Sequence, residues 1–125
     1  MKLHLANPVA LHLITHYDAE FVQVGTRRMS GPSMVICPDR VIESWGVANV
    51  GALAPGDFQA LLELTPEIVL LGTGSRLRFP ATFLTHCLAE ARIGLEIMDL
   101  GAACRTYNIL AGEGRRVAAA LILRD

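Results

Sequence analysis

The chain has 125 residues, of which 52% are hydrophobic and 18% are charged, and its formal net charge at pH 7 is -1. This apolar content supports a packed core in a single domain spanning residues 1–125, and it excludes disorder as a description of the whole chain. The lack of a basic excess argues against nucleic-acid binding, because proteins meet a phosphate backbone with clustered Lys and Arg side chains.

The three cysteines of the chain form no Cys-x-x-Cys pair. Their odd number argues against a disulfide framework, and their spacing argues against a thiolate zinc site. Two histidines, an asparagine and a proline interrupt the apolar start of the chain, so no continuous signal-peptide core is present. No apolar run approaches membrane-spanning length. We therefore expect a cytoplasmic protein in a reducing compartment, with no metal and no cofactor.

The first half of the chain shows the alternation of apolar and polar residues that is typical of antiparallel strands. Two hairpins are predicted, with strands at residues 13–17 and 21–24 and at residues 33–37 and 40–45. A short polar turn joins the first pair of strands, and Pro38-Asp39 joins the second pair. The segment at residues 25–32 is predicted to be a polar loop that carries Arg27 and Arg28.

The second half of the chain alternates between helical and strand periodicity. The predicted elements are a helix at 57–64, a strand at 67–71, a helix from Pro80 to Gly94 with an apolar stripe of Phe83, Leu84, Cys87, Leu88 and Ala91, a strand at 95–98, a helix at 102–111 and a strand at 117–123. This order implies right-handed crossovers and parallel pairing. The sequence thus predicts an α/β (α+β) fold, with a parallel or mixed sheet, helices against it, and an antiparallel sheet from the first half.

The segment Gly72-Thr73-Gly74 lies between a strand and the following helix, where dinucleotide-binding folds place a glycine motif. Leu77 occupies the position of the third glycine, and Pro80 delays the start of the helix. A turn that needs glycine dihedrals is therefore favoured over a pyrophosphate site. The same loop carries Arg76 and Arg78, which make it a candidate site for a small anion.

The best candidate site begins at Asp99, because ligands of open α/β sheets bind beyond the carboxyl ends of strands. The helix that follows holds Thr106, Tyr107 and Asn108 in its interior, although all three are weak helix formers. Local helix preference does not explain them, so they are candidates for a functional surface. The alternative is that Tyr107 is core and that Asn108 satisfies a backbone group.

The same helix places Arg105 and Ile109 on the side away from its apolar face. An exposed Arg beside an exposed Ile is typical of a partner surface, and the alternative is a merely solvated Arg105. Cys104 lies in the first turn, where the helix dipole and the adjacent Arg105 lower a thiol's pKa. No histidine is tied to Cys104 by a motif, so a small buried hydrophobe is favoured over a reactive thiolate.

Arg115 and Arg116 begin the last predicted strand. Either Glu113 forms an ion pair with one of them, or the two arginines face an acidic partner. No Ser/His/Asp order, no paired-carboxylate motif and no phosphate loop with a lysine appears, so no residue set dictates a reaction.

Four segments taken together resemble a known family. They are Pro-Glu-Ile-Val-Leu-Leu-Gly-Thr-Gly at 66–74, Glu-Ile-Met-Asp at 96–99, Ala-Cys-Arg-Thr-Tyr-Asn at 103–108 and Glu-Gly-Arg-Arg-Val-Ala-Ala-Ala-Leu-Ile at 113–122. In this order they resemble the domain-of-unknown-function family 498/598, whose mitochondrial members include assembly factor 3 of NADH dehydrogenase (complex I). The resemblance covers most of the chain and is strongest over residues 33–122.

The resemblance implies a three-layer β/β/α fold and no established enzymatic activity. It also implies a functional surface made of Gly72 to Gly74, Asp99 and the residues from Arg105 to Asn108. Leu100 stands where the family is expected to have Thr, which weakens the case for polar chemistry at that point. The lack of a targeting sequence suggests a bacterial-type member.

Two functional hypotheses follow. The first is a non-enzymatic protein-binding or assembly-factor-like module with an unidentified protein partner. The second is a small-molecule or anion-binding protein with cryptic enzymatic activity at the strand-end groove. A third interpretation assigns all these residues a structural role. The candidate binding surface consists of Gly72, Thr73, Gly74, Arg76, Arg78, Asp99, Cys104, Arg105, Thr106, Tyr107, Asn108 and Arg115.

Overall fold

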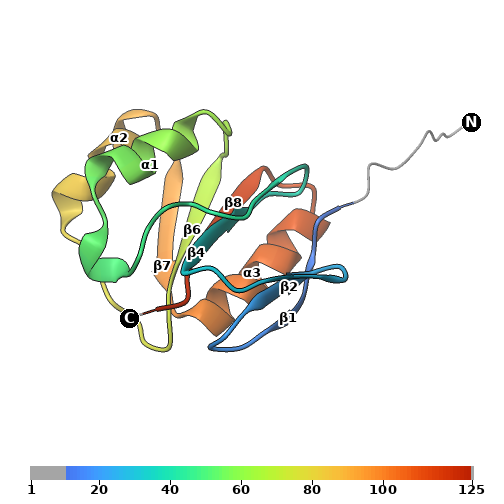
Figure 1. Cartoon of the computed structure of the whole chain (residues 1–125). Coiled ribbons are helices and arrows are strands. Elements are labelled where there is room, and N and C mark those ends of the chain that lie inside the picture. The colour runs from blue at the N-terminus through green and yellow to red at the C-terminus, as the bar shows by residue number, and fades with distance from the viewer. Residues whose placement is uncertain (1–10, 125) are drawn as a thin grey trace, which may run out of the picture.

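A five-stranded mixed sheet forms the centre of the computed structural model, which describes residues 11–124 (Figure 1). Its strands are β4 (Ser33–Ile36), β5 (Val41–Ile42), β6 (Ile68–Thr73), β7 (Gly94–Met98) and β8 (Val117–Ile122). The strand order is β5-β4-β8-β6-β7. β6 pairs in parallel with β7 and β8, whereas β4 pairs antiparallel with β5 and β8. The predicted parallel pairing and the second predicted hairpin are both confirmed.

A three-stranded antiparallel sheet packs beside the central one. Its strands, in spatial order, are β1 (Ile14–Tyr17), β2 (Val22–Val24) and β3 (Arg27–Met29). The prediction of a polar loop at residues 25–32 is wrong, because this segment contains β3. β3 turns only Met29 into the core, while Arg27 and Arg28 face solvent and Arg27 forms an ion pair with Glu43. A three-residue edge strand with one buried side chain is too short to show alternation.

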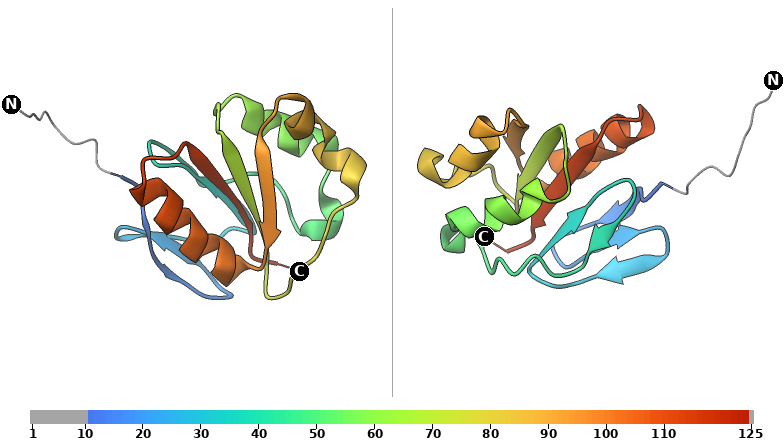
Figure 2. Two further views of the ribbon diagram at one scale, coloured as in Figure 1. Left: turned by 180° about the vertical axis from the view of Figure 1, so that it is seen from behind. Right: turned by 90° about the horizontal axis from the view of Figure 1, so that it is seen from above.

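The helices lie on both faces of the central sheet (Figure 2). They are the 3-10 helix η1 (Val50–Ala52), α1 (Pro55–Leu62), the 3-10 helix η2 (Thr82–Thr85), α2 (His86–Glu90) and α3 (Leu100–Gly112). α3 and the three-stranded sheet cover one face, and the other four helical segments cover the opposite face. The predicted three-layer β/β/α architecture is confirmed, with α3 lying in the layer of the small sheet.

Alternate residues of the central strands feed two separate cores, because successive side chains of a strand point to opposite faces. In β8, Ala119 and Leu121 join the core beneath α3, whereas Ala118, Ala120 and Ile122 join the core beneath α1 and α2. Every residue of β8 is buried. Strands buried on both faces read as continuous apolar runs, as the sequence of β8 does.

The predicted helix from Pro80 to Gly94 is largely wrong. The segment forms a 3-10 turn and then a five-residue helix, and Phe83 is 68% exposed instead of belonging to an apolar stripe. Leu84 and Leu88 do pack into the core. Arg92 takes the left-handed turn conformation with φ 59°, and Gly94 begins β7. Two threonines in the first turn, which are poor helix formers, are consistent with the break.

The other two helices begin two residues earlier than predicted, and aspartates stabilise both N-termini. In α1, the Asp57 carboxylate accepts a hydrogen bond from the Ala54 N–H at 2.8 Å. In α3, the Asp99 carboxylate accepts one from the Ala102 N–H at 2.9 Å. No helix among residues 11–124 is long and apolar enough to cross a bilayer. The interrupted apolar start of the chain falls almost entirely outside the described residues.

Candidate functional site

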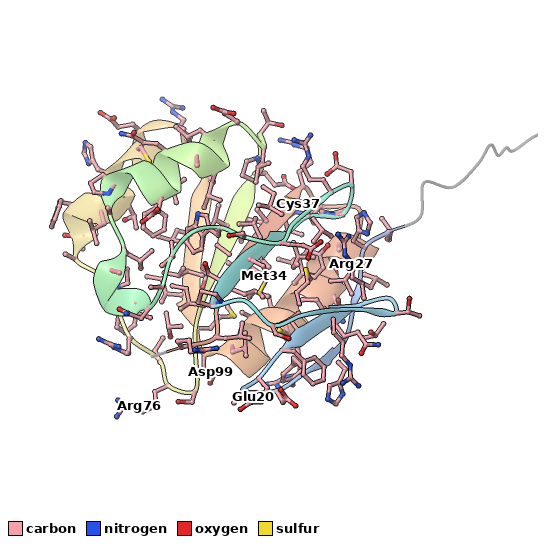
Figure 3. All side chains as sticks on the ribbon, viewed as in Figure 1. Glu20, Arg27, Met34, Cys37, Arg76 and Asp99 are labelled. Atoms are coloured by element: carbon pink, nitrogen blue, oxygen red, sulfur yellow. The ribbon has the colours of Figure 1, made fainter. Side chains whose placement is uncertain are left out.

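A pocket of about 400 Å³ lies at the carboxyl ends of the parallel strands, where we expect ligands of such sheets to bind. Its lining comes from the β1–β2 turn, the ends of β6, β7 and β8, and the start of α3: Tyr17, Asp18, Ala19, Gly74, Ser75, Asp99, Leu100, Gly101 and Leu123. Of the predicted site residues, the pocket brings together Gly74 and Asp99. Figure 3 shows Asp99 at the same end of the molecule as Glu20, which belongs to the β1–β2 turn.

Both carboxylates of this strand-end pocket are engaged in local structure. Asp99 caps α3, and Asp18 accepts hydrogen bonds from the N–H groups of Glu20 and Phe21 at 2.7 and 3.1 Å. Leu100 is 6% exposed and belongs to the core beneath α3, so the cap of this helix comes from Asp99 and not from residue 100. Two carboxylates in the lining make the pocket unfavourable for an anion.

Thr73 holds the loop at the end of β6 through hydrogen bonds of its side chain. This loop begins with Gly72, Thr73 and Gly74, and we call it the glycine loop. The buried Thr73 hydroxyl donates to the Arg76 carbonyl at 2.7 Å and accepts from the Arg78 N–H at 3.1 Å. Gly74 has φ +84°, the left-handed conformation that favours glycine. Figure 3 shows the Arg76 side chain extending away from the body of the protein. Neither Arg76 nor Arg78 lines the strand-end pocket.

Gly72 serves packing. A Cβ at this position would lie 3.0 Å from Leu121 Cδ2 and 3.1 Å from Ala103 Cβ. Gly72 therefore lets α3 approach the central sheet closely, and this explains the first glycine of the motif without a ligand. The prediction of a turn that needs glycine dihedrals holds for Gly74 but misses this role.

Asn108 and Tyr107 join α3 to the first strand. The Asn108 side chain accepts from the Ile14 N–H and donates to the Ile14 carbonyl, both at 2.8 Å. The Tyr107 ring is buried, and its hydroxyl donates to the His12 carbonyl. Burial, followed by the nearby Cys37 and Asp39, raises the pKa of Tyr107. The structural interpretation of these two residues is confirmed, and Thr106 is half-buried.

Arg105 lies on the exposed side of α3, as predicted, and it is not simply solvated. Its guanidinium donates to the Tyr17 hydroxyl at 2.6 Å. Gly101 provides the room, because a Cβ there would lie 3.1 Å from the Arg105 Nη1 and 3.2 Å from the Tyr17 Cε1. This pair stands at the edge of the strand-end pocket, which Tyr17 and Gly101 line.

Exposed apolar side chains continue from that pair along the line where residues 11–17 run beside α3. Ile109 is 62% exposed, Leu11 is 47% exposed and Leu13 is 37% exposed. Ile14 and Asn108 are hydrogen-bonded to each other. Leu13 is the chain neighbour of Ile14 and Ile109 is the chain neighbour of Asn108, so Leu13 and Ile109 lie along the same line of contact. We call this surface, made of Leu11, Leu13, Tyr17, Arg105 and Ile109, the α3 seam.

Cys104 is buried, with 1% of its surface exposed. Burial raises the pKa of its thiol to about 12, and the opposing effect of Arg105 is smaller. The hypothesis of an activated thiolate is therefore wrong, and Cys104 acts as the small buried hydrophobe that was favoured. The helix dipole does not prevail because desolvation disfavours the charged form more strongly.

Arg115 lies apart from the other candidates, at the amino end of β8. It forms an ion pair with Glu67 at 2.8 Å and not with Glu113. The Glu67 carboxylate also accepts from the Arg116 N–H, and these bonds, with that from Arg115 foremost, lower its pKa. Arg115 lines a second cavity, of about 280 Å³, together with Cys37 and other residues; Figure 3 shows Cys37 far from Asp99.

The structure thus divides the predicted surface into separate places. The sequence analysis missed Tyr17, Leu11 and Leu13, because nothing in a strand pattern shows which edge contacts a distant helix. It also missed the exposure of Phe79 and Phe83, at 72% and 68%. Between residues 11 and 124, no three His, Cys, Asp or Glu side chains gather as ligands for a metal ion.

Comparison with known proteins agrees with the resemblance. The model of the family described as "Protein of unknown function (DUF498/DUF598)" matches residues 14–122. Bovine NADH dehydrogenase [ubiquinone] 1 alpha subcomplex assembly factor 3 is 31% identical over 122 residues, which cover 96% of this chain and 65% of the relative. The chain therefore spans just under two thirds of the length of that relative.

Solved structures of bacterial proteins share the fold. The NMR structure of a Xanthomonas campestris protein is 39% identical, has a TM-score of 0.83, and the match covers 98% of this chain and 92% of that one. The crystal structure of a Bordetella parapertussis protein is 36% identical, has a TM-score of 0.84, and the match covers 90% of this chain and 96% of that one. With a family model that matches almost the whole described chain, this protein belongs to the DUF498/DUF598 family.

Proposed function

We propose that this protein is a non-enzymatic protein-binding module of the assembly-factor type and that it contacts its partner through the α3 seam. The observation that carries the proposal is that exposed apolar side chains line the contact between residues 11–17 and α3, beside the hydrogen-bonded pair of Arg105 and Tyr17. Tyr and Arg are enriched among the few residues that supply most of the binding energy at protein interfaces, and the core of an interface is apolar. The hydrogen bond between Arg105 and Tyr17 orders both side chains before binding, which lowers the entropic cost of association.

Similarity to the bovine protein supports the same class of function, since that relative is named as an assembly factor of a respiratory complex. Assembly factors act through contacts with other proteins. The second hypothesis, an anion site shared by the glycine loop and Asp99, has less support. Arg76 and Arg78 do not line the strand-end pocket, and Asp18 and Asp99 do.

The test is a quantitative affinity purification from the native host with three variants of the tagged protein. Arg105→Glu reverses the charge of the seam, and Ile109→Asp places a charge on its most exposed apolar position. Arg92→Glu is the matched control, because it makes the same charge change at an exposed position outside the seam. We expect both seam variants to lose the same protein, and the control to retain it.

The captured protein is then purified and titrated against each variant. We expect the seam variants to bind at least roughly ten-fold more weakly than the wild type, since charge reversal at an interface costs more than about 1.4 kcal/mol. Melting curves confirm that each variant is folded. Identical protein lists from the wild type and both seam variants would show that the α3 seam is not the contact surface.

A further inference from the structure

A second exposed surface lies in the segment of residues 76–83, which runs from the loop after β6, at the end of the molecule that holds Asp99 (Figure 3), into η2. Leu77, Phe79 and Phe83 are 50%, 72% and 68% exposed. Apart from the α3 seam, these are the remaining large apolar side chains that are well exposed within residues 11–124. Figures 1 and 2 place η2, at the end of this segment, on the flank away from α3 and the three-stranded sheet.

Two arginines alternate with the apolar residues. Arg76 and Arg78 flank Leu77, both are exposed, and neither forms a salt bridge or a side-chain hydrogen bond with any residue between 11 and 124. Most other arginines of the protein have such a partner. The sequence has no acidic residue between Glu67 and Glu90. The segment is therefore locally cationic in a chain whose net charge is -1.

The segment is also presented in a fixed shape. The Thr73 hydroxyl, buried at the end of β6, binds the Arg76 carbonyl and the Arg78 N–H. These two bonds close a turn with Leu77 at its tip. Residues 76–83 line neither of the two cavities described above. The surface is thus a projection that carries apolar side chains outward, and it is not a groove for a peptide.

We propose that the segment of residues 76–83 binds peripherally to the surface of an anionic lipid bilayer. Exposed Phe and Leu side chains enter the boundary between headgroups and acyl chains, and Arg side chains at the same level meet the lipid phosphates. A flat bilayer accommodates a projection, whereas a protein partner would need a matching hollow. Two exposed arginines that form no salt bridge within residues 11–124 favour an anionic partner over a neutral one.

This inference is independent of the α3 seam. The segment and the seam share no residue, and η2, in which the segment ends, lies on the flank away from α3 (Figure 2). If the protein and its partner are both held at the bilayer surface, they move in two dimensions, and this raises the effective concentration of each protein for the other.

The experiment is co-sedimentation with vesicles of phosphatidylglycerol and phosphatidylcholine in equal parts, against vesicles of phosphatidylcholine alone. We expect the wild type to bind the anionic vesicles and to dissociate as salt is raised. The double variant Arg76→Gln/Arg78→Gln should bind the anionic vesicles roughly 25-fold more weakly at low salt, because each lost charge weakens binding by about five-fold. Phe79→Ser with Phe83→Ser should weaken it by at least roughly ten-fold.

Two matched controls are available on other surfaces. Arg92→Gln removes an exposed arginine and Ile109→Ser removes an exposed apolar side chain, and we expect both variants to bind the vesicles as the wild type does. The proposal is overturned if the wild type binds anionic vesicles no better than neutral ones, or if the segment variants bind as well as the controls. It is equally overturned if the segment variants lose a captured protein while their vesicle binding is unchanged, because the segment would then be a protein contact.

Discussion

Asn108→Ala should destabilise the protein although the residue lies on a partly exposed helix. The side chain makes two hydrogen bonds with the Ile14 backbone, and each contributes about 1 kcal/mol net. Alanine is a better helix former than asparagine by about 0.5 kcal/mol, which offsets part of the loss. The free energy of unfolding should therefore fall by about 1.5 kcal/mol, and by more if water does not reach the two freed Ile14 groups.

Urea unfolding followed by the fluorescence of Trp45 measures this change. With a slope of about 1.5 kcal/mol per M, the midpoint should fall by about 1 M while the slope is unchanged. Hydrogen exchange of the Ile14 amide should become faster in the variant, since that N–H loses its acceptor. Gln59→Ala on α1 is the control, because Gln59 is exposed and should change stability by less than about 0.5 kcal/mol.

A midpoint for Asn108→Ala that coincides with that of Gln59→Ala would refute the reasoning. It would mean that the two bonds contribute no more than the water contacts they replace. Faster exchange at Ile14 without a shift in midpoint would show that the bonds exist but do not stabilise the fold.

Two further predictions concern other parts of the fold. Gly72→Ala should lower the free energy of unfolding by about 1–3 kcal/mol, because its Cβ would press on α3 and β8, whereas Gly56→Ala, with open space in α1, should raise it by up to about 1 kcal/mol in the same urea assay. Alkylation at pH 8 followed by peptide mass spectrometry should label the half-buried Cys87 well before Cys104, whose pKa is about 12; equal rates in the folded protein would contradict its burial.

Periodicity predicted most of the second half, because strands buried on both faces, such as β6 and β8, and a helix with one buried face, such as α3, leave a strong local pattern. The pattern failed where few side chains meet the core. β3 was missed because Met29 is its only buried residue. η2 was mistaken for part of a regular helix because Phe83 was counted in an apolar stripe, although its side chain is exposed. Contacts between segments far apart in the chain, such as that between Arg105 and Tyr17, leave no local signal at all.

The candidate site shows the same division. The sequence correctly placed Asp99 at a strand end and Arg105 on the exposed side of α3. For Cys104 it favoured a small buried hydrophobe, as the structure shows, but it left a dipole-activated thiolate open, because burial is a tertiary property. The packing role of Gly72 was equally hidden, since the side chains it accommodates come from α3 and β8.

The position of β8 in the central sheet has a consequence for synthesis in the cell. β8 is the last strand in chain order, yet it lies between β4 and β6 and pairs with both. Until β8 has been translated, no strand connects β4 to β6, and both cores lack the side chains that β8 contributes. Folding of the central sheet during elongation is therefore delayed, and the nascent chain exposes apolar strands to chaperones until β8 is available.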